Sequence, residues 1–148
     1  MHALPGDLDC TVITHSPTIA AALVPHERAE VFLLGGRLFK HSAVTCGAAA
    51  AEAASNVAAD LFFLGVTGVH PEHGLTTGDA DEAAMKRTLA SRAVETYVLA
   101  SAEKLGAASR YQVLPLSAVA GVITDGSPAG TVTALAAQDV TILPGLAP

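Results

Sequence analysis

The chain has 148 residues, of which 51% are hydrophobic and 15% charged, and its formal net charge is −6. This composition excludes a disordered tail, and the length fits one domain with its own core. The acidic balance argues against direct nucleic-acid binding, because a surface that grips phosphate backbones is normally basic. The apolar runs are short and interrupted, so we expect no membrane-spanning helix and no membrane partner.

The expected secondary structure alternates between strands and helices after a lead-in over residues 1–9. Short β-branched or apolar runs predict strands over residues 10–14, 30–36, 37–45, 60–66, 96–100, 113–116, 121–125 and 139–143. Alanine-rich or amphipathic stretches predict helices over residues 15–24, 47–58, 79–93 and 131–138. The alternation predicts an open, mainly parallel α/β sheet with both faces covered, in a single domain over residues 1–148.

Two helix starts carry recognisable capping patterns. Ser16 is a good N-cap residue, and Pro17 suits the first helical position. The pair Asp79 and Glu82 resembles a capping box, and Glu82 also stands four residues before Lys86, where the two side chains form an ion pair. Asp79, Asp81 and Glu82 are candidate catalytic carboxylates as well, but helix capping explains them more simply.

The two cysteines, Cys10 and Cys46, are far apart in the sequence and show neither a metal-type spacing nor a disulfide framework. We interpret both as small core residues in a reducing, cytoplasmic setting.

In a parallel α/β sheet, ligands bind beyond the carboxyl ends of the strands. Serine, threonine, glycine, lysine and arginine concentrate at those positions, which suits an anionic or hydroxyl-rich small molecule. The positions are Thr14–Ser16, Gly35–Arg37, Thr67–Asp79, Ser101–Gly106 and Asp125–Gly126.

Each of these candidates also has a simpler interpretation. Ser16 needs no role beyond capping, Lys104 is a surface lysine unless its place at the sheet edge matters, and Gly35-Gly36 is a tight turn. His70 and His73 flank Glu72 in a loop, but the spacing is not that of a helical zinc motif and no third ligand is signalled. We therefore expect no metal site.

Several motifs of catalysis and cofactor binding are absent from the sequence. There is no G-x-S-x-G elbow, no G-x-G-x-x-G and no G-x-x-x-x-G-K-[ST], so neither a serine hydrolase nor a nucleotide cofactor is supported. We expect no cofactor and no enzymatic activity.

Five segments, in this order, resemble the C-terminal effector-sensing domain of DeoR-type bacterial transcription regulators. The resemblance extends from about residue 10 to about residue 144, and residues 65–87 are its most specific part. The segments are TVITHS (11–16), EVFLLGGRL (30–38), ADLFFLGVTGVHPEHGLTTGDADEAAMKR (59–87), YVLASAEKLGAAS (97–109) and GVITD (121–125).

This resemblance implies a Rossmann-like three-layer sandwich similar to ribose-phosphate isomerases and CoA transferases. It also implies a sensor for a phosphorylated sugar or a related metabolite, acting as a homo-oligomer in a repressor-type regulator. DNA would be bound only through a separate N-terminal helix-turn-helix domain, which the sequence lacks. The effector contacts carried over by motif position are Thr14, His15, Ser16, Gly35, Gly36, Arg37, Thr67, Gly68, Gly74, Leu75, Thr76, Lys86 and Lys104.

The sequence departs from the family pattern at four places. An Asp-Gly-x-Thr-Thr-like loop that precedes the first matched strand in the family, and that the resemblance implies forms part of the phosphate cradle, is absent. His15 stands where the family often has Asn, and Thr67 and Ala100 stand where it has Asp.

Two other functions remain open at this stage. A sugar-phosphate isomerase would suit the same fold, but it needs a carboxylate base, and Val66-Thr67-Gly68-Val69 offers none. A dimerisation module with a vestigial pocket is the other alternative.

Overall fold

A computed structural model describes residues 4–126 and 129–145 of the chain. The chain divides into two compact units, Met1–Val57 and Ala58–Pro148, called here the N-terminal unit and the C-terminal unit. A single domain over residues 1–148 stays a prediction.

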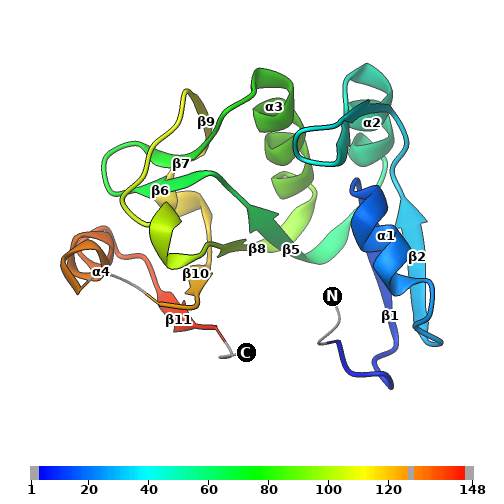
Figure 1. Ribbon diagram of the computed structural model, residues 1–148, viewed down its shortest axis with the longest axis horizontal. Coiled ribbons are helices and arrows are strands. Elements are labelled where there is room, and N and C mark those ends of the chain that lie inside the picture. The colour runs from blue at the N-terminus through cyan, green and yellow to red at the C-terminus, as the bar shows by residue number, and fades with distance from the viewer. Residues whose placement is uncertain (1–3, 127–128, 146–148) are drawn as a thin grey trace. The chain divides into compact units, whose positions relative to one another are not determined.

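The N-terminal unit contains a parallel strand pair joined by a helix (Figure 1). The pair runs from Cys10 opposite Ala29 to Thr14 opposite Leu33, so both carboxyl ends lie at the same edge. The elements of this unit are β1 (Cys10–Thr14), α1 (Pro17–Leu23), β2 (Ala29–Leu33), β3 (Arg37–Phe39), β4 (Val44–Cys46) and α2 (Ala48–Ser55).

The segment 37–45, expected as one strand, is an antiparallel hairpin of β3 and β4. The chain reverses over Lys40–Ala43, where the backbone N–H of Ala43 donates to the carbonyl of Lys40 at 3.4 Å and Ala43 has φ 51°. The sequence did not indicate this turn, because Lys-His-Ser-Ala is not a strong turn sequence and apolar residues stand on both sides of it.

The C-terminal unit combines a four-stranded parallel sheet with a three-stranded antiparallel one. The parallel sheet has the order β11-β10-β8-β5, and the antiparallel sheet has the order β6-β7-β9. The elements are β5 (Ala59–Gly65), β6 (Gly68–His70), β7 (Gly74–Thr77), α3 (Ala80–Ala90), β8 (Ala93–Leu99), η1 (Ala102–Lys104), β9 (Tyr111–Leu114), η2 (Leu116–Ala118), β10 (Gly121–Thr124), α4 (Ala129–Ala136) and β11 (Ile142–Pro144).

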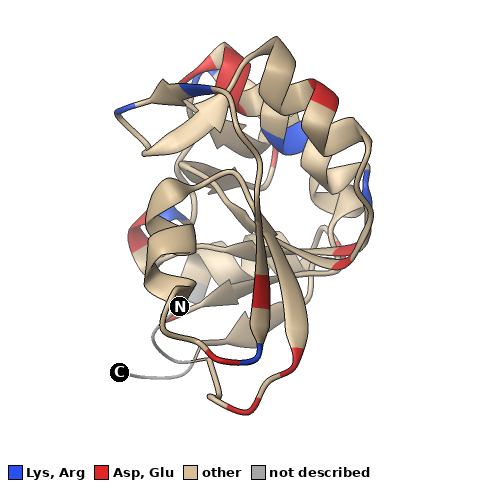
Figure 2. Ribbon diagram, turned by 90° about the vertical axis from the view of Figure 1, so that its right-hand side faces the viewer, with Lys and Arg blue, Asp and Glu red and all other residues tan. Residues whose placement is uncertain are grey.

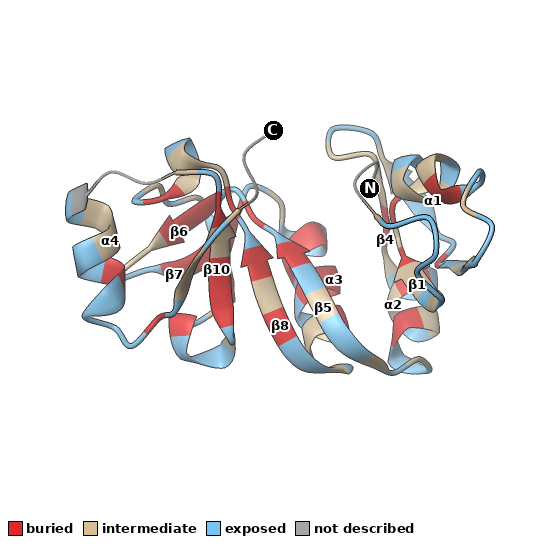
Figure 3. Cartoon of the chain, turned by 90° about the horizontal axis from the view of Figure 1, so that it is seen from below, coloured by how far each residue is buried: buried red, intermediate tan, exposed pale blue. Residues whose placement is uncertain are grey.

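One face of the parallel sheet forms the core of this unit. Leu64, Val98 and Val122 stand side by side on β5, β8 and β10, and each has no exposed surface. Leu135 of α4 and Ala83 of α3 belong to the same buried cluster. Figure 3 shows buried positions alternating with more exposed ones along β8, as a sheet with one covered face requires. The mainly parallel α/β sheet with flanking helices, a Rossmann-like sandwich, is confirmed.

The opposite face of the same sheet is apolar but accessible. Leu61, Phe63 and Leu99 are between 44% and 54% exposed. The continuous apolar runs of the strands had predicted that both faces of the sheet are buried. Among the described residues of this unit, only one face of the sheet is buried.

Residues 67–79, expected as a loop, contain the β6–β7 hairpin. Val69 pairs with Leu75, and β7 pairs in turn with β9, so most of the segment has ladder hydrogen bonds. Thr76, Thr77 and Val69 are β-formers, and Pro71 lies in the turn at the hairpin tip. The glycines in this segment are typical of loops, so the sequence did not indicate the two short strands between them.

Other boundaries differ by a few residues. The helix predicted over 79–93 ends at Ala90, because β8 already begins at Ala93. The strand predicted over 139–143 begins only at Ile142, since Asp139 has φ 58° and turns the chain there.

Charged residues are sparse and mixed in sign. In Figure 2 the Lys and Arg positions are scattered along the ribbon among the more numerous Asp and Glu positions, eight against fourteen. None of the described helices combines the length and apolarity that crossing a membrane requires.

The backbone of Ala107 passes so close to Gly68 that only glycine fits at this position. A Cβ added there would lie 2.3 Å from the carbonyl oxygen of Ala107, so the chain would have to move. We expect Gly68→Ala to lower the free energy of unfolding by about 2 kcal/mol or more, as measured by urea denaturation. Gly65→Ala is the control, because a Cβ at Gly65 meets nothing within 4 Å. Equal effects of the two substitutions would contradict this packing.

Candidate functional site

In the N-terminal unit, the residues after β1 and β2 converge through backbone hydrogen bonds. The N–H of Leu34 donates to the carbonyl of Thr14 at 2.8 Å, and the N–H of Thr45 donates to the carbonyl of His15 at 2.7 Å. The hydroxyl of Thr45 donates to the carbonyl of Leu34 at 2.7 Å. The residues that follow β1 and β2 are therefore joined to each other and to the middle of β4, and this edge contains three of the predicted contacts, Thr14, His15 and Ser16.

Ser16 occupies the N-cap position of α1, with Pro17 at the first helical position, as predicted. Its hydroxyl does not cap the helix, however, and that part of the prediction is wrong. The hydroxyl instead shares a hydrogen bond of 2.9 Å with the hydroxyl of Thr18 and donates to the carbonyl of Ala43 at 3.2 Å. Ser16 thus joins the start of α1 to the β3–β4 turn, and its side chain is buried.

The residues after β2 also belong to this edge. Gly36 has φ +149°, a backbone conformation that favours glycine, and a Cβ there would lie 2.9 Å from Cβ of Ala50 on α2. Gly35 and Arg37 are exposed. The six predicted contacts of the N-terminal unit are consequently gathered, with Gly35 and Arg37 accessible and Thr14 and Ser16 largely covered.

In the C-terminal unit, the segment after β5 lies against the segment after β8. The N–H of Gly106 donates to the carbonyl of Val69 at 2.8 Å, and Val69 forms an isolated parallel bridge with Leu105. The N–H of Thr67 donates to the carbonyl of Thr76 at 3.0 Å. This brings the predicted contacts Thr67, Gly68 and Thr76 beside the loop that carries Lys104.

Lys104 is the last residue of η1 and is half-buried. Within the described part of the chain, no carboxylate forms a salt bridge with its ammonium group. Its neighbour Glu103 accepts a hydrogen bond from the hydroxyl of Ser101, and this bond, together with a backbone hydrogen bond and the positive charge of Lys104, lowers the pKa of Glu103 below its usual value. The ammonium group of Lys104 is thus available to a ligand at the carboxyl edge of the sheet.

Helix α3 begins at a capped end, as predicted. The N–H of Glu82 donates to the Asp79 carboxylate at 2.9 Å. The carboxylate of Glu82 accepts from the hydroxyl of Thr77 at 3.1 Å and from the ammonium group of Lys86 at 2.7 Å. Thr77 has no exposed surface, and Glu82 and Lys86 are each 7% exposed. The predicted ion pair is confirmed, and both of its side chains are buried.

The remaining predicted contacts of the C-terminal unit, Gly74, Leu75 and Thr76, are buried within the fold. Leu75 has no exposed surface and belongs to the core cluster. Thr76 is buried, and its hydroxyl accepts from the N–H of Ser109 at 2.8 Å. Gly74 is buried and lines a cavity described below. These three residues shape the hairpin.

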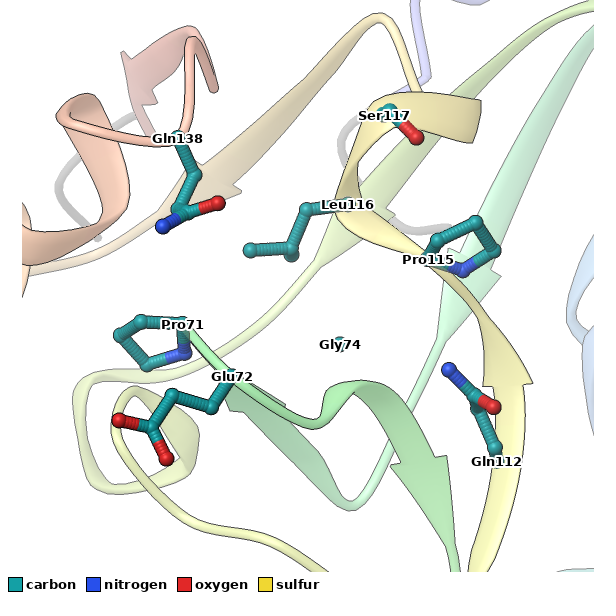
Figure 4. Close-up of a pocket in the computed structure, with 8 residues that line it drawn as sticks. All are labelled: Pro71, Glu72, Gly74, Gln112, Pro115, Leu116, Ser117 and Gln138. Carbon is teal, nitrogen blue, oxygen red and sulfur yellow. The ribbon is translucent and has the colours of Figure 1, made fainter.

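Two cavities flank the hairpin residues of the C-terminal unit. One, of about 220 Å³, includes Gly74 and is drawn in Figure 4; its lining is Pro71, Glu72, Gly74, Gln112, Pro115, Leu116, Ser117 and Gln138. The second, of about 410 Å³, includes Thr76, His73 and Arg110.

The histidines of the hairpin tip interact with each other and with the backbone. The rings of His70 and His73 lie 4.6 Å apart between centroids, and Nδ1 of His70 accepts from the N–H of Glu72 at 3.1 Å. No group of three or more His, Cys, Asp or Glu side chains that could hold a metal ion occurs in the described ranges.

Two polar residues at this edge were not among the predicted contacts. Ser101 and Asp125 follow β8 and β10, and the N–H of Ala102 donates to the Asp125 carboxylate at 3.0 Å. The position of both after a strand was visible in the sequence, but nothing in the motif pattern distinguished them from ordinary loop residues.

The carboxyl edge of the parallel strands, where α/β sheets that bind small molecules hold them, carries hydroxyls, glycines and Lys104. The chain belongs to the family described as the DeoR C terminal sensor domain, whose model matches residues 1–126. It is therefore a ligand-sensing regulatory domain, as the sequence had suggested.

Proteins similar in sequence to this chain are named as transcriptional regulators. The HTH-type transcriptional repressor GlcR of Bacillus subtilis is 36% identical over 121 residues, which cover 82% of this chain and 46% of that protein. The HTH-type transcriptional regulator GlpR of Haloferax volcanii is 33% identical over 145 residues, with 97% and 56% covered. The glycerol-3-phosphate regulon repressor of Escherichia coli is 24% identical over 127 residues, with 86% and 50% covered. The chain spans about half the length of the curated relatives it matches.

The buried ion pair makes a direct prediction about stability. Glu82→Ala leaves the Lys86 ammonium group buried without its carboxylate, so we expect a loss of about 3–5 kcal/mol in the free energy of unfolding by urea denaturation. The double substitution Glu82→Leu with Lys86→Met should lose much less, because neither charge is then stranded. Glu72→Ala, at an exposed carboxylate, is the matched control. A loss as small as that of the control would show that the pair is not buried in solution.

Proposed function

We propose that the chain senses a phosphorylated sugar or a related metabolite and thereby controls operator binding by a separate helix-turn-helix domain. The observation that carries the proposal is the ammonium group of Lys104, held at the carboxyl edge of the sheet and free of any salt bridge in the described part of the chain. An anionic group is the natural partner for such a cation, and nearby hydroxyls suit sugar hydroxyls.

Within the C-terminal unit, the contacts that we assign to the effector are the accessible or half-buried members of the predicted set, Thr67 and Lys104. Within the N-terminal unit, the accessible or half-buried members are His15, Gly35, Gly36 and Arg37, and they stay predicted contacts. The buried members of the C-terminal unit, Gly68, Gly74, Leu75, Thr76 and Lys86, are assigned the role of shaping the site, and Thr14 and Ser16 are the buried members of the N-terminal unit. The name of the Escherichia coli glycerol-3-phosphate regulon repressor supports a phosphorylated effector.

The mechanism is a shift between arrangements of an oligomer. A metabolite that binds one arrangement more tightly than another moves the population toward it, by no more than the difference in binding free energy. If the favoured arrangement holds the helix-turn-helix domains out of register with the operator, effector binding relieves repression. We place this activity in the cytoplasm, where the bacterial DNA lies.

The isomerase alternative is less well supported by the site. The buried carboxylate of Glu82 accepts hydrogen bonds from Thr77 and Lys86, so it is committed to the fold. A general base must instead reach a substrate proton. The regulator names of the similar proteins agree with this assessment.

A ligand screen tests the proposal. Glycerol 3-phosphate, hexose phosphates and inorganic phosphate are added in a thermal-shift assay; a ligand at a hundred times its Kd stabilises the folded state by about 2.7 kcal/mol. We expect Lys104→Ala to weaken the best ligand about tenfold, because one charge-assisted contact is lost.

Lys40→Ala is the control for this substitution. Lys40 is exposed in the β3–β4 turn, and replacing it removes the same charge from the chain. If no phosphorylated ligand stabilises the chain, or if both substitutions weaken binding equally, the proposed sensor site is wrong.

A further inference from the structure

Asp125 and η1 come from neighbouring strands of the parallel sheet. In the pairing of β8 with β10, Leu99 stands opposite Ile123, so the residues that follow the two strands emerge at one edge. There the N–H of Ala102, the first residue of η1, donates to Oδ1 of Asp125 at 3.0 Å. The contact joins residues 23 positions apart in the sequence.

The start of the loop that carries Lys104 is tied to β10 by the bond from the N–H of Ala100 to the carbonyl of Ile123, but the turn that follows has a free first N–H group apart from its contact with Asp125. A 3₁₀ turn of three residues has weak internal hydrogen bonds and leaves its first N–H groups without partners in the turn. Ser101, at the N-cap position, makes no side-chain capping bond, and its hydroxyl donates to the carboxylate of Glu103. The Asp125 carboxylate supplies that missing partner from the neighbouring strand.

The orientation set at Ala102 is transmitted directly to Lys104. The N–H of Lys104 donates to the carbonyl of Ser101 at 2.9 Å, and the N–H of Leu105 donates to the carbonyl of Ala102 at 3.2 Å. These bonds close the turn, so its three residues move together. Fixing the N–H of Ala102 therefore fixes the direction in which Lys104 leaves the backbone.

Asp125 itself is anchored independently of the turn. The hydroxyl of Thr124 donates to the carbonyl of Gly126 at 2.7 Å, and the N–H of Gly145 donates to the carbonyl of Thr124 at 2.6 Å. On the preceding side, the N–H of Ala100 donates to the carbonyl of Ile123 at 3.0 Å. These bonds hold the backbone on both sides of Asp125, from which its side chain reaches the N–H of Ala102.

We propose that Asp125 is a positioning residue for effector binding, which holds η1 so that the ammonium group of Lys104 meets the effector's anionic group. The inference rests on the proposed function for Lys104. Asp125 does not itself contact the anion in this account, since a carboxylate repels it. The loop charges are thereby divided: Ser101 engages Glu103, Asp125 engages the backbone, and Lys104 is left for the ligand.

The two possible effects of removing Asp125 have opposite signs, which makes the test sharp. Loss of a negative charge near the site strengthens anion binding by Coulomb's law, whereas loss of the hydrogen bond to Ala102 weakens it. Asp125→Asn removes the charge but keeps an acceptor oxygen, and Asp125→Ala removes both. Asp60→Ala is the matched control, because Asp60 is an exposed carboxylate on β5 in the same unit.

Binding of inorganic phosphate is measured by calorimetry for the wild-type chain, these three variants, Lys104→Ala, and Lys104→Ala combined with Asp125→Ala. We expect Asp125→Ala to weaken binding about fivefold, and Asp125→Asn and Asp60→Ala to bind at least as tightly as the wild type. In the Lys104→Ala background, Asp125→Ala should change the affinity by less than about twofold, because a residue acting through Lys104 is not additive with it. A fivefold loss in both backgrounds, or no loss in either, overturns the proposal.

A ligand-free measurement separates this inference from the proposed function. Solvent exchange of the Ala102 amide proton, followed by NMR, should be several-fold faster in Asp125→Ala and unchanged in Asp125→Asn. Unchanged exchange in Asp125→Ala overturns the positioning role whatever the binding results are. If the wild-type chain binds no phosphate but the exchange behaves as expected, the proposed role of Lys104 fails while Asp125 is still shown to hold the loop.

Discussion

The parallel pairing of β5, β8 and β10 is the constraint on which the rest of the C-terminal unit depends. Its register places Leu64, Val98 and Val122 in one fully buried row, which supplies the apolar burial that keeps the strands together. The same register fixes where each strand ends. Because all three run in one direction, their polar continuations must emerge at one edge, and the site is a consequence of how the core is packed.

A second, polar constraint holds the hairpin to α3. Thr77 on β7 donates to Glu82, and Glu82 pairs with Lys86, with all three side chains nearly or completely buried. Charges taken out of water are tolerated only when hydrogen bonds satisfy them, so this cluster accepts a narrow range of geometries. It therefore fixes how the hairpin lies against the helix more tightly than apolar packing alone, which tolerates small shifts.

The sequence predicted the strands and helices that have strong local signals. Residues 10–14 are a strand with those bounds, and the cap at Asp79 was visible because an acidic residue three positions before Glu82 has a specific geometry. Two hairpins were missed, at residues 37–46 and 68–77, since each has short arms and a turn without a strong dipeptide signal. Local propensity describes a helix well, whereas a hairpin depends on a partner strand that propensity does not specify.

The candidate site was predictable in position and much less so in detail. The rule that ligands bind at the carboxyl ends of parallel strands selected the segments that contain Lys104 and Asp125. Leu75 and Lys86, which the family resemblance added to the predicted contacts, are both buried, and the rule did not separate accessible residues from buried ones. Nor did it reveal that Asp125 reaches Ala102, because a side-chain bond to the backbone across 23 positions leaves no mark in either segment.

An acidic chain that recognises an anion depends on where its few cations are placed. With eight lysines and arginines against fourteen aspartates and glutamates, the overall field repels a phosphorylated ligand. At physiological ionic strength, however, that field is screened over about 8 Å, so charges in contact with the ligand dominate those farther away. One well-placed ammonium group can then outweigh the net charge, provided that it does not swing toward a neighbouring carboxylate. In the described residues neither neighbouring acid forms a salt bridge with Lys104: the carboxylate of Glu103 accepts from Ser101 while it senses the charge of Lys104, and the carboxylate of Asp125 accepts from the N–H of Ala102.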